Sequence, residues 1–146
     1  MIEVYSFNNK QAKIPMSQFD ESHLQIIAEG IRLFNAQKYW ECHEDLEDHW
    51  LEEPGPMRNV YWAVIQVAAA MIHYREENLV GARGLIVKAK QKFDRCEQFK
   101  IESALLEKNL SWSEFKKMVR QVPDEPVLAD FKNLFEFRFK DPSIWN

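Results

Sequence analysis

The sequence predicts an all-α fold, a single-domain antiparallel bundle of about five helices around a central buried helix. The segment Arg58–Tyr74 (RNVYWAVIQVAAAMIHY) is apolar around most of the helical circumference, and a helix of this kind is normally buried. The flanking segments carry apolar residues at helical spacing and are joined by short turns. Short turns place successive helices antiparallel, so these observations predict a bundle.

Composition and charge further restrict the class of protein to which this chain can belong. The 146 residues are 46% hydrophobic and 29% charged, as expected for one globular domain over residues 1–146. A net charge of −4 with mixed signs argues against a nucleic-acid partner. The central segment is too short and too interrupted by polar residues to span a membrane. With no signal-peptide pattern and only two cysteines, we expect a cytoplasmic protein.

The helical core is predicted over residues 17–100, after an N-terminal arm at 1–16. Four helices are expected, at residues 17–35, 38–52, 57–76 and 79–99. The second ends at Pro54-Gly55-Pro56, because proline cannot continue a helix and glycine permits the turn. Asn78 separates the third from the fourth.

The C-terminal region, residues 111–146, is predicted to hold a short helix and an aromatic-rich tail. Ser111-Trp112-Ser113-Glu114 matches a capping box, which predicts a helix ending near Gln121. Beyond it, Phe135, Phe137 and Phe139 alternate as in a strand, while the preceding residues suit a helical turn, so both conformations stay open. We expect the tail to pack on the bundle or on another subunit.

A polar seam is expected between the second and third helices. If these helices fold back at the Pro-Gly-Pro turn, residues at equal distance from it lie at the same height. His43 then lies level with Gln66, and Glu47 with Trp62. The predicted seam consists of His43, Glu44, Glu47, Arg58, Gln66 and His73.

Our first hypothesis makes this seam a structural network that requires no cofactor. Glu47 would pair with Arg58 and Gln66 would bridge to His43, so the network would hold the helices in register. Glu47→Ala should then destabilise the fold more than Glu41→Ala, because it would leave Arg58 unpaired.

The alternative is a metal-dependent hydrolase. His43-Glu44-x-x-Glu47 resembles the HExxH signature of zinc enzymes, with His43 and Glu47 as ligands of one divalent metal such as zinc and Glu44 as the base. The second histidine of that signature is replaced by Glu47, which weakens the match. His73 is the candidate third ligand, although the register places it about two turns away. The structural network is the favoured hypothesis.

A third option is a small-ligand pocket beside Gln66. Its aromatic lining candidates are Tyr39, Trp40 and Trp62.

A set of residues within Phe34–Phe93 resembles a known family, the domain of unknown function 309. The residues that carry the resemblance are Phe34-Asn35, Tyr39, Glu41, His43-Glu44, Leu46-Glu47, Trp50, Arg58, Gln66, Ala68-Ala69, His73, Asn78 and Gly81-Ala82. The resemblance implies an all-helical bundle found in bacteria and archaea, without an established activity or cofactor. We therefore expect a non-catalytic helical protein that binds a macromolecule or itself, with the aromatic tail offering a surface for a homo-oligomer.

Overall fold

The computed structural model describes residues 18–145, and the expected arm at residues 1–16 lies outside them. The described residues form seven α-helices and two 3₁₀ helices without a strand, so the predicted all-α class is confirmed. The α-helices are α1 (Glu21–Asn35), α2 (Tyr39–Glu52), α3 (Arg58–Arg75), α4 (Leu79–Gln98), α5 (Ala104–Leu110), α6 (Trp112–Arg120) and α7 (Lys132–Glu136). The 3₁₀ helices are η1 (Leu128–Phe131) and η2 (Pro142–Ile144). The helix count exceeds the predicted five because the chain after residue 100 folds into three short helices.

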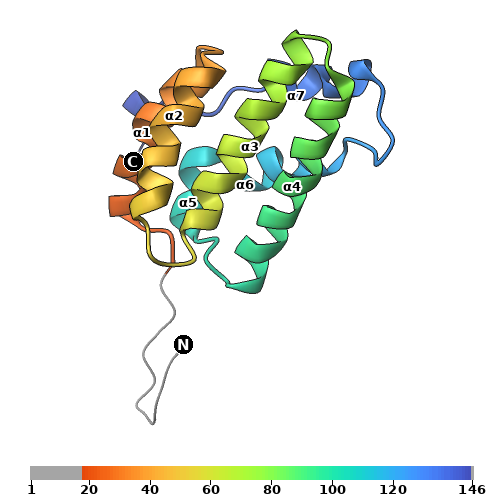
Figure 1. Ribbon diagram of the computed structural model, residues 1–146. Helices are drawn as coiled ribbons and strands as arrows, with labels where there is room; N and C mark the ends of the chain where they lie inside the picture. Colours follow the sequence, from red (N-terminus) through yellow and green to blue (C-terminus); the bar gives the residue numbers. More distant parts are fainter. Residues whose placement is uncertain (1–17, 146) are drawn as a thin grey trace.

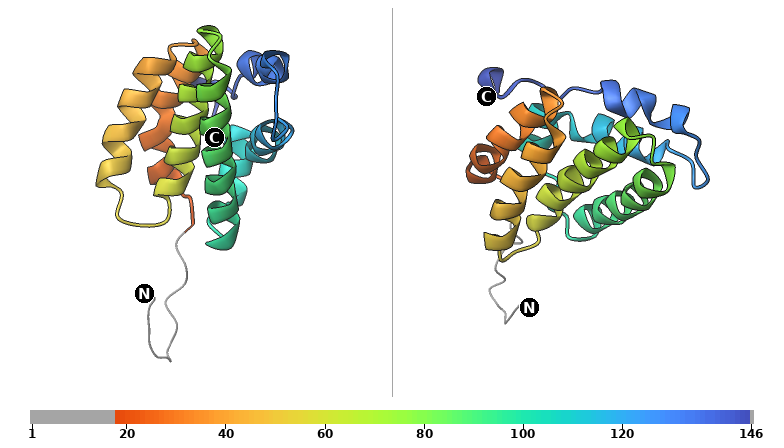
Figure 2. Two further views of the ribbon diagram at one scale, coloured as in Figure 1. Left: turned by 45° about the vertical axis from the view of Figure 1, so that its right-hand side comes forward. Right: turned by 45° about the horizontal axis from the view of Figure 1, so that its top comes forward.

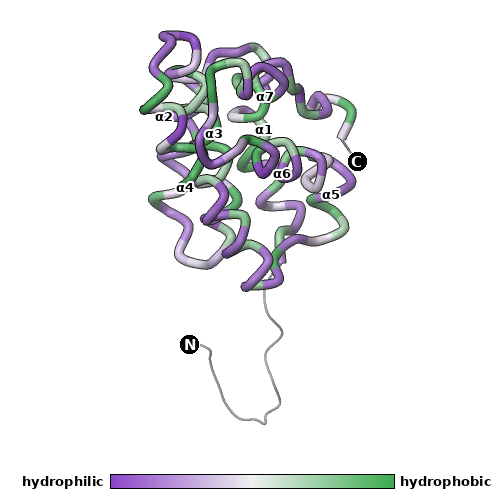
Figure 3. Tube along the Cα trace, turned by 90° about the vertical axis from the view of Figure 1, so that its right-hand side faces the viewer, coloured by the Kyte–Doolittle hydropathy of each residue, from purple (hydrophilic) through white to green (hydrophobic). Residues whose placement is uncertain are grey.

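Helices α2, α3 and α4 lie side by side as one layer, with α3 in the middle (Figure 1). Helices α1, α5, α6 and α7 lie behind this layer (Figures 1 and 2). Most of α3 is buried between the two layers, as predicted for the central helix. Hydrophobic and hydrophilic stretches follow one another along the trace (Figure 3), because most helices turn one side toward the core. None of the helices between residues 18 and 145 has the length and apolar content needed to cross a bilayer.

Helices α1 and α2 cross at very short range. A Cβ atom added to Gly30 would lie 2.5 Å from the Leu46 side chain, closer than any real contact. Glycine lowers the helix propensity at this position, but it permits the close packing of α1 on α2. Asp20 caps the start of α1, where its carboxylate accepts hydrogen bonds from the backbone N–H groups of Ser22 and His23.

The hydrophobic core extends well past residue 100, where the sequence placed its end. Buried apolar residues from the C-terminal region join it, namely Ile101, Leu106, Leu110, Trp112, Phe115, Val119, Val122, Phe131, Leu134 and Phe139. They cover the inner side of the α2–α3–α4 layer. The aromatic tail therefore packs on its own bundle, with Phe131 and Phe139 buried and with Phe135, Phe137 and Trp145 half-buried.

The tail is attached to the turn between α1 and α2 by hydrogen bonds. The Asn35 amide donates to the Phe139 carbonyl at 3.0 Å and accepts from the Phe139 N–H at 2.8 Å. Gln37 and the Tyr39 hydroxyl both donate to the Phe135 carbonyl. Phe135 lies in α7 and Phe137–Phe139 is extended without a partner strand, which resolves the two conformations left open by the sequence.

Helix α6 forms where the sequence predicts a helix, but the predicted capping box is wrong. Ser111 has a φ of 48° and caps the end of α5, so its side chain does not cap α6. The start of α6 is instead held by Glu107, whose carboxylate accepts from the N–H and hydroxyl of Ser113. Ser111 is the single residue between α5 and α6, so it is both the C-cap of α5 and the N-cap of α6. It adopts the left-handed conformation that is common at the end of a helix.

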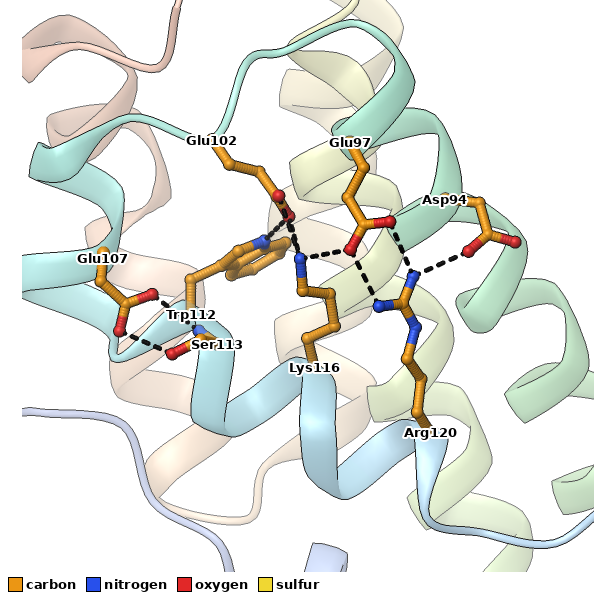
Figure 4. A network of polar contacts seen from close by, with 8 residues as sticks. All are labelled: Asp94, Glu97, Glu102, Glu107, Trp112, Ser113, Lys116 and Arg120. Carbon is orange, nitrogen blue, oxygen red and sulfur yellow. Dashed lines mark hydrogen bonds and ion pairs between the residues drawn. The ribbon is translucent and has the colours of Figure 1, made fainter.

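An ion-pair network joins the C-terminal half of α4 to α6 (Figure 4). Arg120 binds Asp94 and Glu97, and Lys116 binds Glu97 and Glu102. The Trp112 indole N–H also donates to Glu102. These two hydrogen-bonded cations hold the pKa of Glu97 at about 2, well below its usual value.

Candidate functional site: the outer side of the α2–α3–α4 layer

Helix α3 has one stripe that the back layer does not cover. Arg58, Trp62 and Ala69 follow one another at helical spacing and are only half-buried, whereas the other residues from Asn59 to Met71 are buried. Gln66 lies on the same stripe and is 6% exposed. The stripe runs between α2 and α4, so side chains of three helices meet along it.

Cations lie over tryptophan rings along this stripe in a cation–tryptophan ladder, which we define as Trp50, Arg58, Trp62, Lys92 and Arg95. The Arg58 guanidinium carbon lies 4.1 Å from the centre of the Trp50 ring. The Trp50 and Trp62 rings lie 4.9 Å apart. On the far side, Lys92 Nζ is 4.2 Å and the Arg95 guanidinium carbon 5.9 Å from the Trp62 ring. Contacts of this kind contribute about 0.5–2 kcal/mol each, more when they are shielded from water.

The cations of the ladder lack acidic partners among the described residues. Within residues 18–145, Arg58, Lys92 and Arg95 make no ion pair with a carboxylate. Lys92 is only 4% exposed. Burial is the largest cause that lowers its pKa, and the nearby charges of Arg95 and Lys88 lower the pKa further. Positive charge is thus concentrated at a place where no described carboxylate offsets the cost of its burial.

Several buried polar atoms at the same place have no hydrogen-bond partner among the described residues. They are His43 Nδ1, Trp50 Nε1, Arg58 Nε and Gln66 Oε1. Buried polar groups in proteins are normally satisfied, and those that are not often serve a ligand or an ordered water. The predicted seam is therefore polar, but it is not a closed hydrogen-bonded network.

The predicted ion pair between Glu47 and Arg58 does not form among the described residues. Glu44 and Glu47 are exposed on α2, and neither makes a described hydrogen bond or ion pair. Arg58 instead stacks on Trp50 and donates to the Trp50 carbonyl at 3.4 Å. The large flat ring one helical turn along α2 from Glu47 offers Arg58 more contact than a solvated carboxylate does.

His43 and His73 also lie differently from the prediction. His43 stacks on the ring of Trp40, and its bridge to Gln66 is not formed. His73 lies at the turn between α3 and α4, where its Nδ1 contacts the Asn78 amide at 3.1 Å. Asn78 in turn caps α4 by accepting from the Gly81 N–H. His73 therefore belongs to the helical turn and is not part of the seam.

The residues of the metal hypothesis do not converge. Among residues 18–145, no group of three or more histidine, cysteine, aspartate or glutamate side chains is arranged to hold a metal ion. His43 and Glu47 share one face of α2, while His73 lies at the far end of α3. Among the described residues, His43 and Glu47 are thus the candidate ligands that lie near each other, with Glu44 exposed beside them.

The three candidate pocket residues are not brought together either. Tyr39 is fully buried and contacts Phe34, Phe135 and Arg75 on the side of the tail. Trp40 is 57% exposed, and Trp62 faces the ladder. Adjacent positions on a helix point about 100° apart, so Tyr39 points into the core while Trp40 points to solvent.

Sequence reasoning missed Lys92 and Arg95 as members of the site. In the sequence, the basic run of Lys88, Lys90, Lys92 and Arg95 is typical of a solvated helix face, and nothing in its spacing links it to a tryptophan on α3. A signal was present at Lys92 itself, because its position continues the buried stripe of Ala82, Ile86, Ala89 and Phe93.

The fold and this outer face define a small helical protein with a charged aromatic surface. Residues 27–85 match the model of the family described as Domain of unknown function (DUF309). The resemblance predicted from Phe34–Phe93 is therefore confirmed. The matched region spans α2 and α3 with parts of α1 and α4, and it includes His43, Trp50, Arg58 and Gln66 of the outer face.

A relative of this region occurs in Bacillus subtilis (strain 168). The "Uncharacterized protein YpuF" of that organism is 46% identical over 55 residues, which are 36% of this chain and 32% of that protein. The match thus spans about a third of the length of this relative. No solved structure matches the chain. These comparisons identify the helical segment and leave its activity open.

Proposed function

We propose that this is a non-catalytic binding protein whose outer α2–α3–α4 face recognises an acidic segment of a partner protein. The observation that carries the proposal is the cation–tryptophan ladder, in which Arg58, Lys92 and Arg95 make no ion pair with a described carboxylate. The free thiols of Cys42 and Cys96 suit a reducing cytoplasm as the place of action.

Carboxylates are the groups that the ladder would bind. Lys92 is held on the Trp62 ring with its charge largely removed from water, which lowers its pKa. A carboxylate at this position would offset that cost, since charge-assisted hydrogen bonds are about twice as strong as neutral ones. The flat tryptophan rings keep the cations in place and so reduce the entropy lost on binding.

A partner protein suits the surroundings of the ladder better than a small ion. Trp40 is 57% and Leu51 65% exposed on the neighbouring side of α2. Exposed large apolar residues next to charged ones are typical of protein interfaces, in which aromatic residues and arginine carry much of the binding energy. The distance between Trp40 and Leu51 is about three helical turns, which suits a partner helix better than a single side chain.

The test is a titration with a fluorescent peptide rich in glutamate, measured by polarisation at low ionic strength. We expect saturable binding that weakens as salt is added. Lys88→Gln combined with Arg95→Gln should reduce affinity about tenfold, which corresponds to ~1.4 kcal/mol. Both positions are exposed, so these substitutions should leave the fold intact.

Lys117→Gln is the matched control, because Lys117 is an exposed cation on α6, behind the layer. It should bind the peptide as the parent protein does. Equal affinities for the parent and for the Lys88/Arg95 variant would overturn the proposal, as would binding that does not respond to salt.

A further inference from the structure

We propose that the acidic partner is a second copy of this chain, docked with α2 of each copy on α4 of the other. This inference rests on the proposed function, because it names the protein segment that the ladder binds. It follows from the distribution of charge across the layer, from the heights of the charged residues and from symmetry.

Helices α2 and α4 carry opposite charge on the two sides of α3. Helix α2 has six acidic residues and no lysine or arginine. Helix α4 has five basic residues and two acidic ones, Asp94 and Glu97. Both of these acids are bound by Arg120 of α6, so the side of α4 that faces the ladder stays basic. The outer face is therefore acidic along one edge and basic along the other.

The charged residues on the two edges occur at matching heights. Lys92 contacts Trp62, and because α3 and α4 are antiparallel, Lys88 lies one turn further on, level with Gln66. On the opposite side the turn at Pro54-Gly55-Pro56 places Glu47 level with Trp62. Glu44 lies about one residue from the level of Gln66. Glu47 thus matches Lys92, and Glu44 matches Lys88, across α3.

Two-fold symmetry defines how two copies with these matching edges would dock. A two-fold axis parallel to α3 exchanges the two edges of the face and leaves heights unchanged. It would bring Glu47 of one copy to Lys92 of the other, and Glu44 to Lys88, twice in the dimer. An axis across α3 would instead place the acidic α2 against its own copy, which like charges disfavour. The axis parallel to α3 is therefore the one we propose.

Apolar residues fit the same arrangement. Trp40 of one copy would lie at the height of Leu85 of the other, and Leu85 is half-buried on α4. The small side chain of Ala69, half-buried at the same height on α3, leaves room between them for the indole. Leu51 falls near the level of Arg95, whose aliphatic stem can cover it. The interface would thus combine apolar contacts with charge pairs.

The first experiment measures the oligomeric state by sedimentation velocity, using two charge-reversed variants. One variant is Glu44→Lys with Glu47→Lys, and the other is Lys88→Glu with Arg95→Glu; all four positions are exposed. We expect a dimer for the parent protein and monomers for each variant alone. An equimolar mixture should form a dimer again, because one of its two α2–α4 contacts keeps the native residues on both helices and the other restores opposite charges at positions 44 and 88.

The second experiment tests the geometry directly with the double variant Glu44→Cys and Lys88→Cys. Within one copy these residues lie across α3, roughly 16–20 Å apart at the usual spacing of packed helices. A short bismaleimide should therefore link two copies and should give little internal product. The native Cys42 and Cys96 are buried, so the parent protein serves as the unreactive control.

The outcomes separate this inference from the proposed function. A parent protein that stays monomeric at high concentration, while binding the glutamate peptide through Lys88 and Arg95, would overturn the dimer and leave the binding function intact. A dimer that neither charge-reversed variant disrupts would overturn the docking geometry. Loss of both peptide binding and charge-dependent dimerisation would overturn both proposals.

Discussion

A Cβ atom on Gly81 would lie 2.7 Å from Nδ1 of His73, closer than real Cβ contacts allow. The histidine ring cannot easily withdraw, because its Nδ1 contacts the Asn78 amide. Asn78 in turn accepts the hydrogen bond that caps α4. These residues form one compact turn between α3 and α4, and all three are among the residues that carry the family resemblance.

Gly81→Ala should therefore destabilise the protein. Overpacking of this kind costs about 1–3 kcal/mol, which outweighs the gain in helix propensity. Gly84→Ala is the matched control, because no atom lies within 4 Å of a Cβ added there. It should stabilise α4 by about 0.5–1 kcal/mol. Urea unfolding of the two variants checks the prediction, and a gain in stability for both would contradict it.

Asn35→Ala should loosen the C-terminal tail. The substitution leaves the N–H and carbonyl of Phe139 without their partner, and we expect a loss of about 1–3 kcal/mol. Asn133→Ala, on the exposed side of α7, is the control and should change stability by less than about 0.5 kcal/mol. Faster hydrogen exchange at the Phe139 amide in the Asn35 variant alone would confirm the local cause. Unchanged exchange would show that the tail is held by its aromatic packing.

Arg58→Ala should cost more stability than either Glu41→Ala or Glu47→Ala. Arg58 stacks on Trp50 at 4.1 Å, and the loss of this contact should cost about 1–2 kcal/mol. Both glutamates are exposed, so their removal should change stability by less than about 0.5 kcal/mol. This revises the expectation from sequence that Glu47→Ala would be the more harmful of the two glutamate variants. Thermal melts of the variants check this prediction. A clearly lower melting temperature for Glu47→Ala than for Glu41→Ala would support the ion pair predicted from the sequence.

Stability should fall in acid partly through Glu97. Its pKa is about 2 in the folded protein, against 4.5 for an unperturbed glutamate. Because the folded value is the lower one, the contribution is fully present above about pH 4.5 and is lost as the pH falls toward 2. Glu97→Gln should therefore flatten the fall in melting temperature between pH 5 and pH 2.5. Glu114→Gln, on an exposed position of α6, is the control and should follow the parent curve.

The helices of the layer could be predicted from sequence because their signals are local. Apolar spacing, Pro54-Gly55-Pro56 and Asn78 located α1 to α4 to within a few residues. The same local reasoning failed at Ser111. Its side chain does not cap α6, because this single residue joins α5 to α6 and adopts the left-handed conformation. It also left the tail undecided, since short segments take their conformation from what they pack against.

The sequence by itself determined the all-α class, the central position of α3 and the identity of several polar residues that face α2. Only the tertiary structure decided how those residues interact. Arg58 stacks on the Trp50 ring and does not pair with Glu47. Lys92 contacts Trp62 from α4, a helix that sequence spacing did not connect to this tryptophan. Helical periodicity reports which side of a helix faces inward, because burial acts on every turn alike. The choice among partners depends on the distance and angle between helices, which arise only when the whole bundle packs.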